Sequence, residues 1–69
     1  MIQAEYGVFE VTCLHNGQQR NLILHVVSTV NHGHRFFLID INGWAVDDSQ
    51  TIAEARRQYA CGIAKEINI

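Results

Sequence analysis

The sequence of 69 residues contains no proline, two cysteines and only five lysine or arginine residues. A secreted disulfide scaffold of this length would normally carry four or more cysteines, so Cys13 and Cys61 are predicted to be reduced thiols in a cytoplasmic protein. Five Lys and Arg against seven Asp and Glu give a formal charge of −2. Dedicated nucleic-acid-binding proteins usually carry a basic excess on one face, so this charge argues against DNA or RNA as the partner.

Long apolar runs are also absent. No segment approaches the ~20 apolar residues of a membrane span, and the first residues lack a basic stretch followed by an apolar run, so we expect neither a membrane partner nor an export signal. Without repeats, low-complexity tracts or linkers, residues 1–69 are predicted to form a single domain. Folding buries only about 60% of the unfolded surface at this size, and such small chains often gain stability from a partner.

Glycines mark three predicted hairpin turns. Asn16-Gly17, His32-Gly33 and Asn42-Gly43 each place a glycine after a residue that tolerates positive φ, between runs rich in β-branched and aromatic residues. Three turns imply four strands. The predicted strands are residues 6–14, 20–30, 35–41 and 44–46.

The pairing register follows if each turn is a two-residue loop. Val11 then lies opposite Leu22, and Val26 lies opposite Ile39. The three hairpins agree on one apolar face, which must be covered by another element. Its predicted members are Phe9, Val11, Cys13, Leu22, Leu24, Val26, Phe37, Ile39, Ile41, Trp44 and Val46.

The segment after the fourth predicted strand supplies the covering helix. Thr51-x-x-Glu54 fits a capping box, in which the Thr51 hydroxyl accepts the Glu54 N–H and the Glu54 carboxylate accepts the Thr51 N–H. The helix is expected to run to about Glu66. Its apolar stripe would be Ile52, Tyr59, Ala60, Ile63 and Ile67, flanked by Ala55, Gly62 and Ala64.

The predicted fold class is therefore α+β. It is an antiparallel meander of three long strands and a short fourth, followed by one C-terminal helix packed on one face. Gly62 inside the helix costs roughly 1 kcal/mol relative to Ala, which suggests a close approach of helix to strands. Arg56 lies in the apolar stripe and has two interpretations: its head group reaches Asp47 or Asp48, or it is a partly buried cation held for a partner's carboxylate.

The opposite face of the predicted sheet is more apolar than a solvated antiparallel face should be. A contiguous patch rimmed by polar groups typically marks a protein contact, whereas scattered apolar residues need no explanation. The face could stack on a second copy about 10 Å away or dock onto a different protein. The predicted partner-binding residues are Tyr6, Val8, Glu10, Ile23, His25, Val27, Phe36, Leu38 and Asp40.

A possible pH-sensitive contact lies in this patch. His25 is expected opposite Asp40, with Glu10 one strand further out. An exposed cross-strand ion pair contributes only a few tenths of a kcal/mol. If a partner buries the group, the two carboxylates would favour the imidazolium, and association would weaken as pH rises.

Residues that could catalyse a reaction or bind a metal are separated in this prediction. His15 is at the first turn and His32 and His34 are at the second, about 30 Å away along a ten-residue strand. Cys13 faces the core and Cys61 faces solvent, so neither meets a histidine as a nucleophile would require. We expect no enzyme, no metal ion and no cofactor.

Thr51-Ile52-Ala53-Glu54-Ala55 resembles the start of the helix in plant AP2 domains and integrase arm-binding domains, where a small antiparallel sheet precedes it. The resemblance implies the alternative function, a small nucleic-acid-associated regulator. Those families read DNA with Arg and Lys on the exposed sheet face, where this chain is expected to present Val8, Ile23, Val27 and Leu38. The helix cations Arg56, Arg57 and Lys65 are a possible phosphate contact.

The first prediction is a non-enzymatic protein-interaction module that uses the outer sheet face. In its brevity and lack of catalytic motifs, the chain resembles small inhibitor and accessory proteins of phages and mobile elements, anti-CRISPR proteins among them. That resemblance implies an inhibitor that binds and occludes a macromolecular target. A homodimer formed through the same face is the competing expectation.

Overall fold

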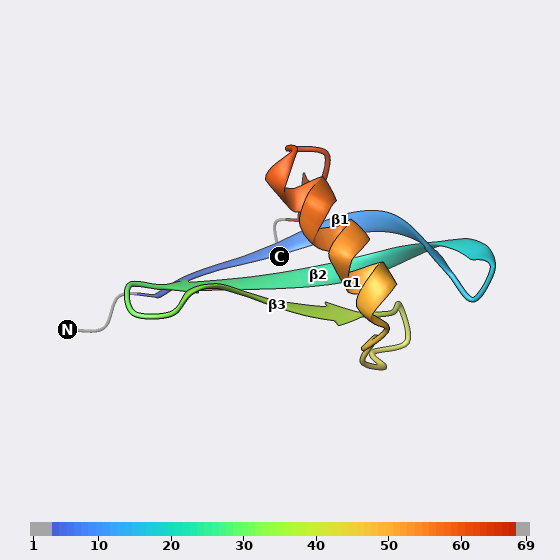
Figure 1. The fold of residues 1–69 in the computed structure, drawn as a ribbon, viewed down its shortest axis with the longest axis horizontal. Coiled ribbons are helices and arrows are strands. Elements are labelled where there is room, and N and C mark those ends of the chain that lie inside the picture. The colour runs from blue at the N-terminus through green and yellow to red at the C-terminus, as the bar shows by residue number, and fades with distance from the viewer. Residues whose placement is uncertain (1–3, 68–69) are drawn as a thin grey trace.

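The computed structural model describes residues 4–67. Within them, four strands form one antiparallel sheet in the order β3-β2-β1-β4, and helix α1 lies across one face of it (Figure 1). The predicted α+β class, an antiparallel sheet with one helix packed on one face, is confirmed. The elements are β1 (Ala4–His15), β2 (Gln18–Thr29), β3 (Gly33–Ile39), α1 (Ser49–Ala60) and β4 (Lys65–Glu66).

β1 and β2 form a long hairpin around Asn16-Gly17. Both turn residues have positive φ, 53° for Asn16 and 77° for Gly17, as a type I′ turn requires. His15 pairs with Gln18 across this two-residue loop, and the same register places Val11 opposite Leu22. The predicted register of the first hairpin is confirmed.

The loop between β2 and β3 is one residue longer than predicted. Residues 30–32 form it, and Thr29 pairs with Gly33, whose φ is 64°. Loops longer than two residues often use a left-handed glycine where the chain rejoins the strand. Val26 therefore lies opposite Phe36 and not Ile39. This shift of three positions is odd, so every side chain of β3 changes face relative to the prediction.

The predicted third hairpin is a turn without a fourth strand. The Asp40 carboxylate accepts the N–H groups of Asn42 and Trp44, both at 2.9 Å, and the Asp40 carbonyl accepts the Gly43 N–H at 3.0 Å. Beyond the turn the pairing is limited to an isolated bridge between Ile39 and Ala45.

Two backbone hydrogen bonds flank that bridge, from the Asp40 N–H to the Trp44 carbonyl at 2.9 Å and from the Val46 N–H to the Leu38 carbonyl at 2.8 Å. Residues 44–46 thus form no strand. The fourth strand of the sheet is β4, which comes after the helix.

The helix begins three residues before the predicted capping box. Asp48 is its N-cap, and its carboxylate accepts the Thr51 N–H at 3.2 Å and the Thr51 hydroxyl at 2.5 Å. Aspartate is among the strongest N-cap acceptors, which explains why the helix starts at Ser49. The predicted capping box is wrong, because Thr51 lies inside the first turn and Glu54 pairs with Arg57.

The helix also ends earlier than predicted, at Ala60. Gly62 has a φ of 75° and its N–H donates to the Tyr59 carbonyl at 3.2 Å, while the Ile63 N–H donates to the Gln58 carbonyl at 2.9 Å. These two bonds form a Schellman motif, for which glycine is the favoured residue. Nothing lies within 4 Å of a Cβ placed on Gly62, so the predicted close approach to the strands is wrong.

After this cap the chain turns back to the sheet. Lys65 pairs with Glu10 and Glu66 with Phe9, so β4 lies beside β1. The predicted continuation of the helix to Glu66 is therefore wrong, and Ile63 and Ile67 do not belong to a helical stripe.

The core lies between α1 and one face of β1, β2 and β3. Leu22 and Leu24 of the central strand are fully buried, and burying a side chain of this size contributes about 1.5–3 kcal/mol. Phe9, Phe36, Ile52 and Tyr59 pack against the core at its margin. The buried members are Val11, Cys13, Leu22, Leu24, Val26, Leu38, Val46 and Ala55.

Polar side chains of α1 cover the edge of β1 beyond β4. The buried Gln58 donates from its amide nitrogen to the Thr12 carbonyl at 2.8 Å, and the buried Thr51 hydroxyl lies 3.5 Å from the Leu14 carbonyl. The bond from Gln58 satisfies a strand-edge carbonyl that would otherwise be unpaired, whereas the Thr51 hydroxyl donates its proton to Asp48. The Gln58 side chain therefore faces the sheet.

Candidate functional site

The sheet face turned away from α1, here called the outer face, is not covered by any element of residues 4–67 (Figure 1). In its central part, six of eleven strand residues are apolar, and Tyr6 and Phe37 are exposed at 63% and 54%. These eleven residues are Tyr6, Val8, Glu10, Thr12, Asn21, Ile23, His25, Val27, Arg35, Phe37 and Ile39. Leu14 and Gln19 continue the face towards the first turn, and Thr29 and Gly33 continue it towards the second.

Two stacked rings lie near the centre of the outer face. The Tyr6 and His25 ring centroids are 5.7 Å apart with planes inclined by 28°, and the Tyr6 hydroxyl hydrogen-bonds to Nδ1 of His25. His25 has Val8 on one side of it and Phe37 on the other. The hydrogen-bonded pair of Tyr6 and His25 thus lies among apolar neighbours. Tyrosine is enriched at protein interfaces because its ring is apolar and its hydroxyl can form a hydrogen bond.

The segment after α1 widens the outer face. Lys65 lies beside Glu10, and the Ile67 N–H donates to the Val8 carbonyl at 2.8 Å. Val8 is buried at this position, while Ile67 is half-buried. This extension was missed because residues 63–67 have apolar spacing that also suits a helix.

Six of the nine predicted partner-binding residues lie on the outer face. They are Tyr6, Val8, Glu10, Ile23, His25 and Val27. The placement of the other three is wrong. Phe36 and Leu38 lie opposite Val26 and Leu24, on the face under α1, because the second hairpin has the longer loop. Asp40 lies in the turn after β3.

Phe37 and Ile39 take the places that were assigned to Phe36 and Leu38. They lie opposite His25 and Ile23 on the outer face. A glycine at position 33 also fits the end of a three-residue loop, and that reading would have identified them.

The predicted cluster of His25, Asp40 and Glu10 does not form. The Asp40 carboxylate accepts backbone N–H groups within its own turn, and His25 pairs with Phe37 at the position where Asp40 was expected. Glu10 lies between Ile23 and Lys65. The predicted pH-sensitive contact between His25 and two carboxylates is therefore wrong.

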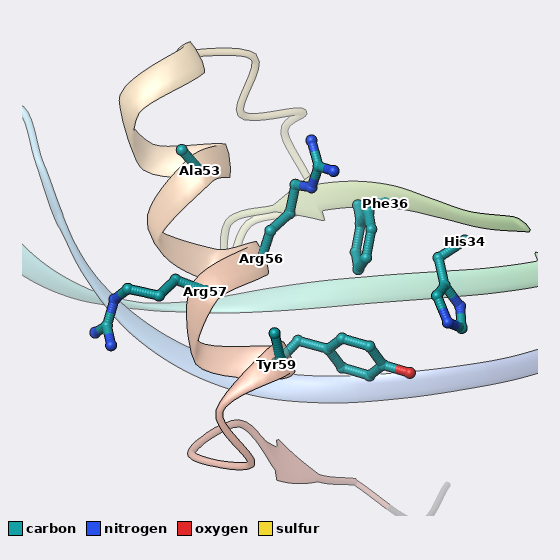
Figure 2. A pocket seen from close by; sticks show the side chains of 7 residues that line it. His34, Phe36, Ala53, Arg56, Arg57 and Tyr59 are labelled. Carbon is teal, nitrogen blue, oxygen red and sulfur yellow. The ribbon is translucent and has the colours of Figure 1, made fainter.

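A second surface lies on the helix side, between α1 and β3. It is an open groove of about 750 Å³, here called the aromatic groove, into which the Phe36 and Tyr59 rings project (Figure 2). Its lining residues are His34, Phe36, Ala53, Arg56, Arg57, Tyr59 and Ala60.

Aromatic contacts hold the floor of this groove. The Tyr59 ring meets Phe36 and Phe9 edge to face, with centroids 5.6 and 5.1 Å apart, and meets His34 at 5.9 Å. Edge-to-face pairs at these distances are favourable beyond the area that they bury. Contacts between the rings of Tyr59, Phe36, Phe9 and His34 thus hold the floor of the groove in place.

Arg56 and Arg57 carry the charge of the aromatic groove and differ in their partners. The Arg56 guanidinium carbon is 5.0 Å from the centre of the Phe36 ring, a cation–π contact, and among the described residues it forms no ion pair with Asp47 or Asp48, so the first predicted interpretation is wrong. Arg56 is exposed and not partly buried, and its role as a cation held for a partner's carboxylate stays a prediction. Arg57 forms an ion pair with Glu54. Hydrogen bonds from Arg57 and then Gln58 lower the pKa of Glu54 to about 2, and Glu54 raises the pKa of Arg57.

Candidate nucleophiles and metal ligands are dispersed. Cys13 is buried, which raises its pKa, and Cys61 is exposed. The Ser28 hydroxyl hydrogen-bonds to Nδ1 of His34, a pair that was not predicted, and no carboxylate of the described chain orients this ring. Between Ala4 and Ile67, no three His, Cys, Asp or Glu side chains are close enough to hold a metal ion.

Comparison of the chain with protein-family models, with curated proteins and with solved structures finds no match in any of the three. The 12-residue α1, the helix of the described residues, is too short and too polar to cross a membrane. The outer face and the aromatic groove beside α1 are the two candidate binding surfaces of residues 4–67.

Proposed function

We propose that this protein is a non-enzymatic interaction module that docks onto a larger protein through its outer face. The observation that carries the proposal is an apolar-centred sheet face with exposed Tyr6 and Phe37 and no covering element in residues 4–67. Exposed patches of this kind, rimmed by polar groups, are typical of protein interaction sites.

The size of the face supports this role. β1 and β2, of 12 residues each, span roughly 40 Å, and the seven-residue β3 spans roughly 23 Å, so strands about 4.8 Å apart give a projected area of roughly 500 Å². This is more than half of the ~800 Å² that each partner contributes to a standard protein interface. No large conformational change is needed to expose it.

Its composition favours a different protein over a second copy. Five of the eleven strand residues in its central part are polar, with Arg35 near one margin and Glu10 beside Lys65 near the other. Obligate homodimer interfaces are more apolar than this, whereas non-obligate interfaces are as mixed as the rest of the surface. A module that acts by occlusion, as the resemblance to phage inhibitors implies, needs such a surface and no catalytic group.

The first test is the mass of the purified chain in solution, measured by light scattering at increasing concentration. We expect a monomer at tens of micromolar. A dimer that Tyr6→Ser dissociates, while Val30→Ser does not, would overturn docking onto a different protein and assign the outer face to self-association. Val30 is a suitable control because it is another exposed hydrophobic residue, at 79%, and lies in the loop before β3.

The second test identifies the target by a photocrosslinking amino acid at position 6, with position 30 as the control. We expect one protein to crosslink at position 6 alone, and the purified target to bind the native chain and Val30→Ser equally. Tyr6→Ser should weaken that binding at least tenfold, as truncation of an aromatic anchor does. Equal binding by Tyr6→Ser would contradict the proposal.

A further inference from the structure

β3 is an edge strand of the sheet, with β2 on one side only. The Leu38 carbonyl points away from β2, because it accepts the Val46 N–H. Backbone groups alternate in direction along an antiparallel strand, so the N–H and carbonyl groups of His34 and Phe36 point outward as well. No backbone group of residues 4–67 bonds to them there.

An open edge of this kind can receive another strand. The free stretch is short, because Val46 closes it at Leu38, while at the other end it begins after the loop at Gly33. It therefore suits a segment of about four to six residues and not a long strand. The helix stands beside β3 here, and Arg56 and Tyr59 project from it towards Phe36 and His34 (Figure 2).

Hollows flank the free edge and would receive alternate side chains of an added strand. The aromatic groove lies on the helix side. A neighbouring hollow of about 350 Å³ wraps the edge itself, since Arg56 and Ile52 line it from α1, and Arg35 and Phe37 line it from the outer side of β3. Because successive strand residues point to opposite faces, one residue would meet Arg56 and the next would meet Arg35.

The charge around the edge is positive although the chain as a whole is negative. Three of the five Lys and Arg residues, Arg35, Arg56 and Arg57, line these two hollows, and no Asp or Glu lines either. Glu54 neutralises Arg57 by an ion pair, whereas Arg56 lies on the Phe36 ring. Arg35 and Arg56 thus present guanidinium groups on the two sides of one strand edge, which complements carboxylates.

We propose that the free edge of β3 binds a short, extended, acidic segment of a partner protein as an added strand. Its main chain pairs with His34 and Phe36, and two adjacent acidic residues meet Arg56 and Arg35 on opposite faces. Strand addition of this kind draws affinity from main-chain hydrogen bonds and specificity from the pockets for alternate side chains. The site shares Arg35 and Phe37 with the margin of the outer face but does not include Tyr6.

The test uses the full chain labelled with ¹⁵N and a capped seven-residue peptide of valine and threonine with two adjacent glutamates at its centre. We expect the His34 and Phe36 amides to shift and to become protected from hydrogen exchange. The same peptide with two lysines should bind at least tenfold more weakly, and N-methylation of alternate peptide bonds should abolish binding. Equal binding of the glutamate and lysine peptides would overturn the proposal.

Arginine variants locate the contact. Arg56→Gln and Arg35→Gln should each weaken the glutamate peptide about three- to tenfold. Arg20→Gln, which removes the same charge from the far end of β2 where Arg20 bonds to Gln18, should leave binding unchanged. Equal losses in all three variants would mean that peptide binding depends only on the net charge of the protein, and the proposed site would be wrong.

A thymidine oligonucleotide separates the remaining possibility. If it binds in a salt-sensitive way that requires Arg56 while the glutamate peptide does not bind, the edge recognises nucleic acid and strand addition is wrong. Tyr6→Ser should leave peptide binding unchanged, so failure at the edge and failure of the outer-face proposal give different results.

Discussion

Gln58 fixes the position of α1 more strictly than its apolar residues do. Its side chain is buried and donates to the Thr12 carbonyl of β1 at 2.8 Å. A buried polar group that loses its partner costs about 1–3 kcal/mol, so a shift of the helix along β1 would be opposed at this bond. Apolar contacts alone have no such direction, because burial is insensitive to a small displacement.

Glu54 makes stability depend on pH. Its pKa falls from 4.5 to about 2 in the folded protein, first because Arg57 and then because Gln58 donates to the carboxylate. A lowered folded pKa means that the stabilisation is complete above pH 4.5 and is lost as pH falls from 4.5 towards 2. We expect the difference in unfolding free energy between the native chain and Glu54→Gln, from urea titrations, to be largest above pH 4.5 and to shrink towards pH 2.

The comparison must be a difference, because hydrogen bonds from Thr51 also lower the pKa of Asp48 and give the native chain a second acid-sensitive group. Arg57→Gln serves as the matched variant. It removes the cation that pairs with Glu54 instead of the carboxylate. The unfolding free energy of this variant should therefore depend less on pH between 4.5 and 2. A difference between native and Glu54→Gln proteins that is constant from pH 2 to pH 7 would contradict this account.

At the scale of elements, Gly62 decides where α1 ends and β4 begins. Its φ of 75° is one that alanine adopts at a cost of roughly 1–2 kcal/mol, and an added Cβ would contact nothing within 4 Å. Gly62→Ala should therefore lower the unfolding free energy by about that amount through the backbone alone. Gly62→Asn should lower it less, because asparagine tolerates the left-handed region. If the native protein and Gly62→Ala have the same unfolding free energy, the left-handed conformation at position 62 does not contribute to stability.

The first hairpin could be predicted from sequence because Asn16-Gly17 allows one turn type and therefore one register. The second could not, because His32-Gly33 is compatible with loops of two or three residues. Alternation did not resolve the choice either, since residues 36–39 of β3 are all apolar, and either register buries two of them. The outer face was thus identified on β1 and β2 and misassigned on β3.

The start of α1 and the free edge of β3 also could not be predicted from local sequence alone. Asp48 and Thr51 both fit an N-cap. Aspartate is the stronger acceptor, and packing against β1 also favours Asp48 by burying Thr51. The free edge of β3, with Arg56 on Phe36, depends on which strand lies outermost and on how α1 is rotated. Neither is determined by local sequence patterns.

On the scale of the whole molecule, one helix stabilises only the middle of a long sheet. The molecule measures 43 × 25 × 24 Å, and α1 crosses it near the middle of the long axis, so both hairpin ends project beyond the core (Figure 1). The two candidate surfaces follow from this shortage of cover. One is the face that α1 does not reach, and the other is the edge beside which it stands.

Hydrogen exchange should reveal this unequal cover as a gradient of opening free energies. Residues 23–29 of β2 are paired on both sides, and Leu24 is fully buried, so amides at the centre of β2 should exchange slowest, through near-global unfolding. Amides at the hairpin ends, residues 16–20 and 30–32, should exchange orders of magnitude faster. The His34 and Phe36 amides should resemble those ends despite lying in a strand, because they point away from β2. Protection of these two amides equal to that of Leu24, in the free monomer at neutral pH, would mean that the edge is already closed.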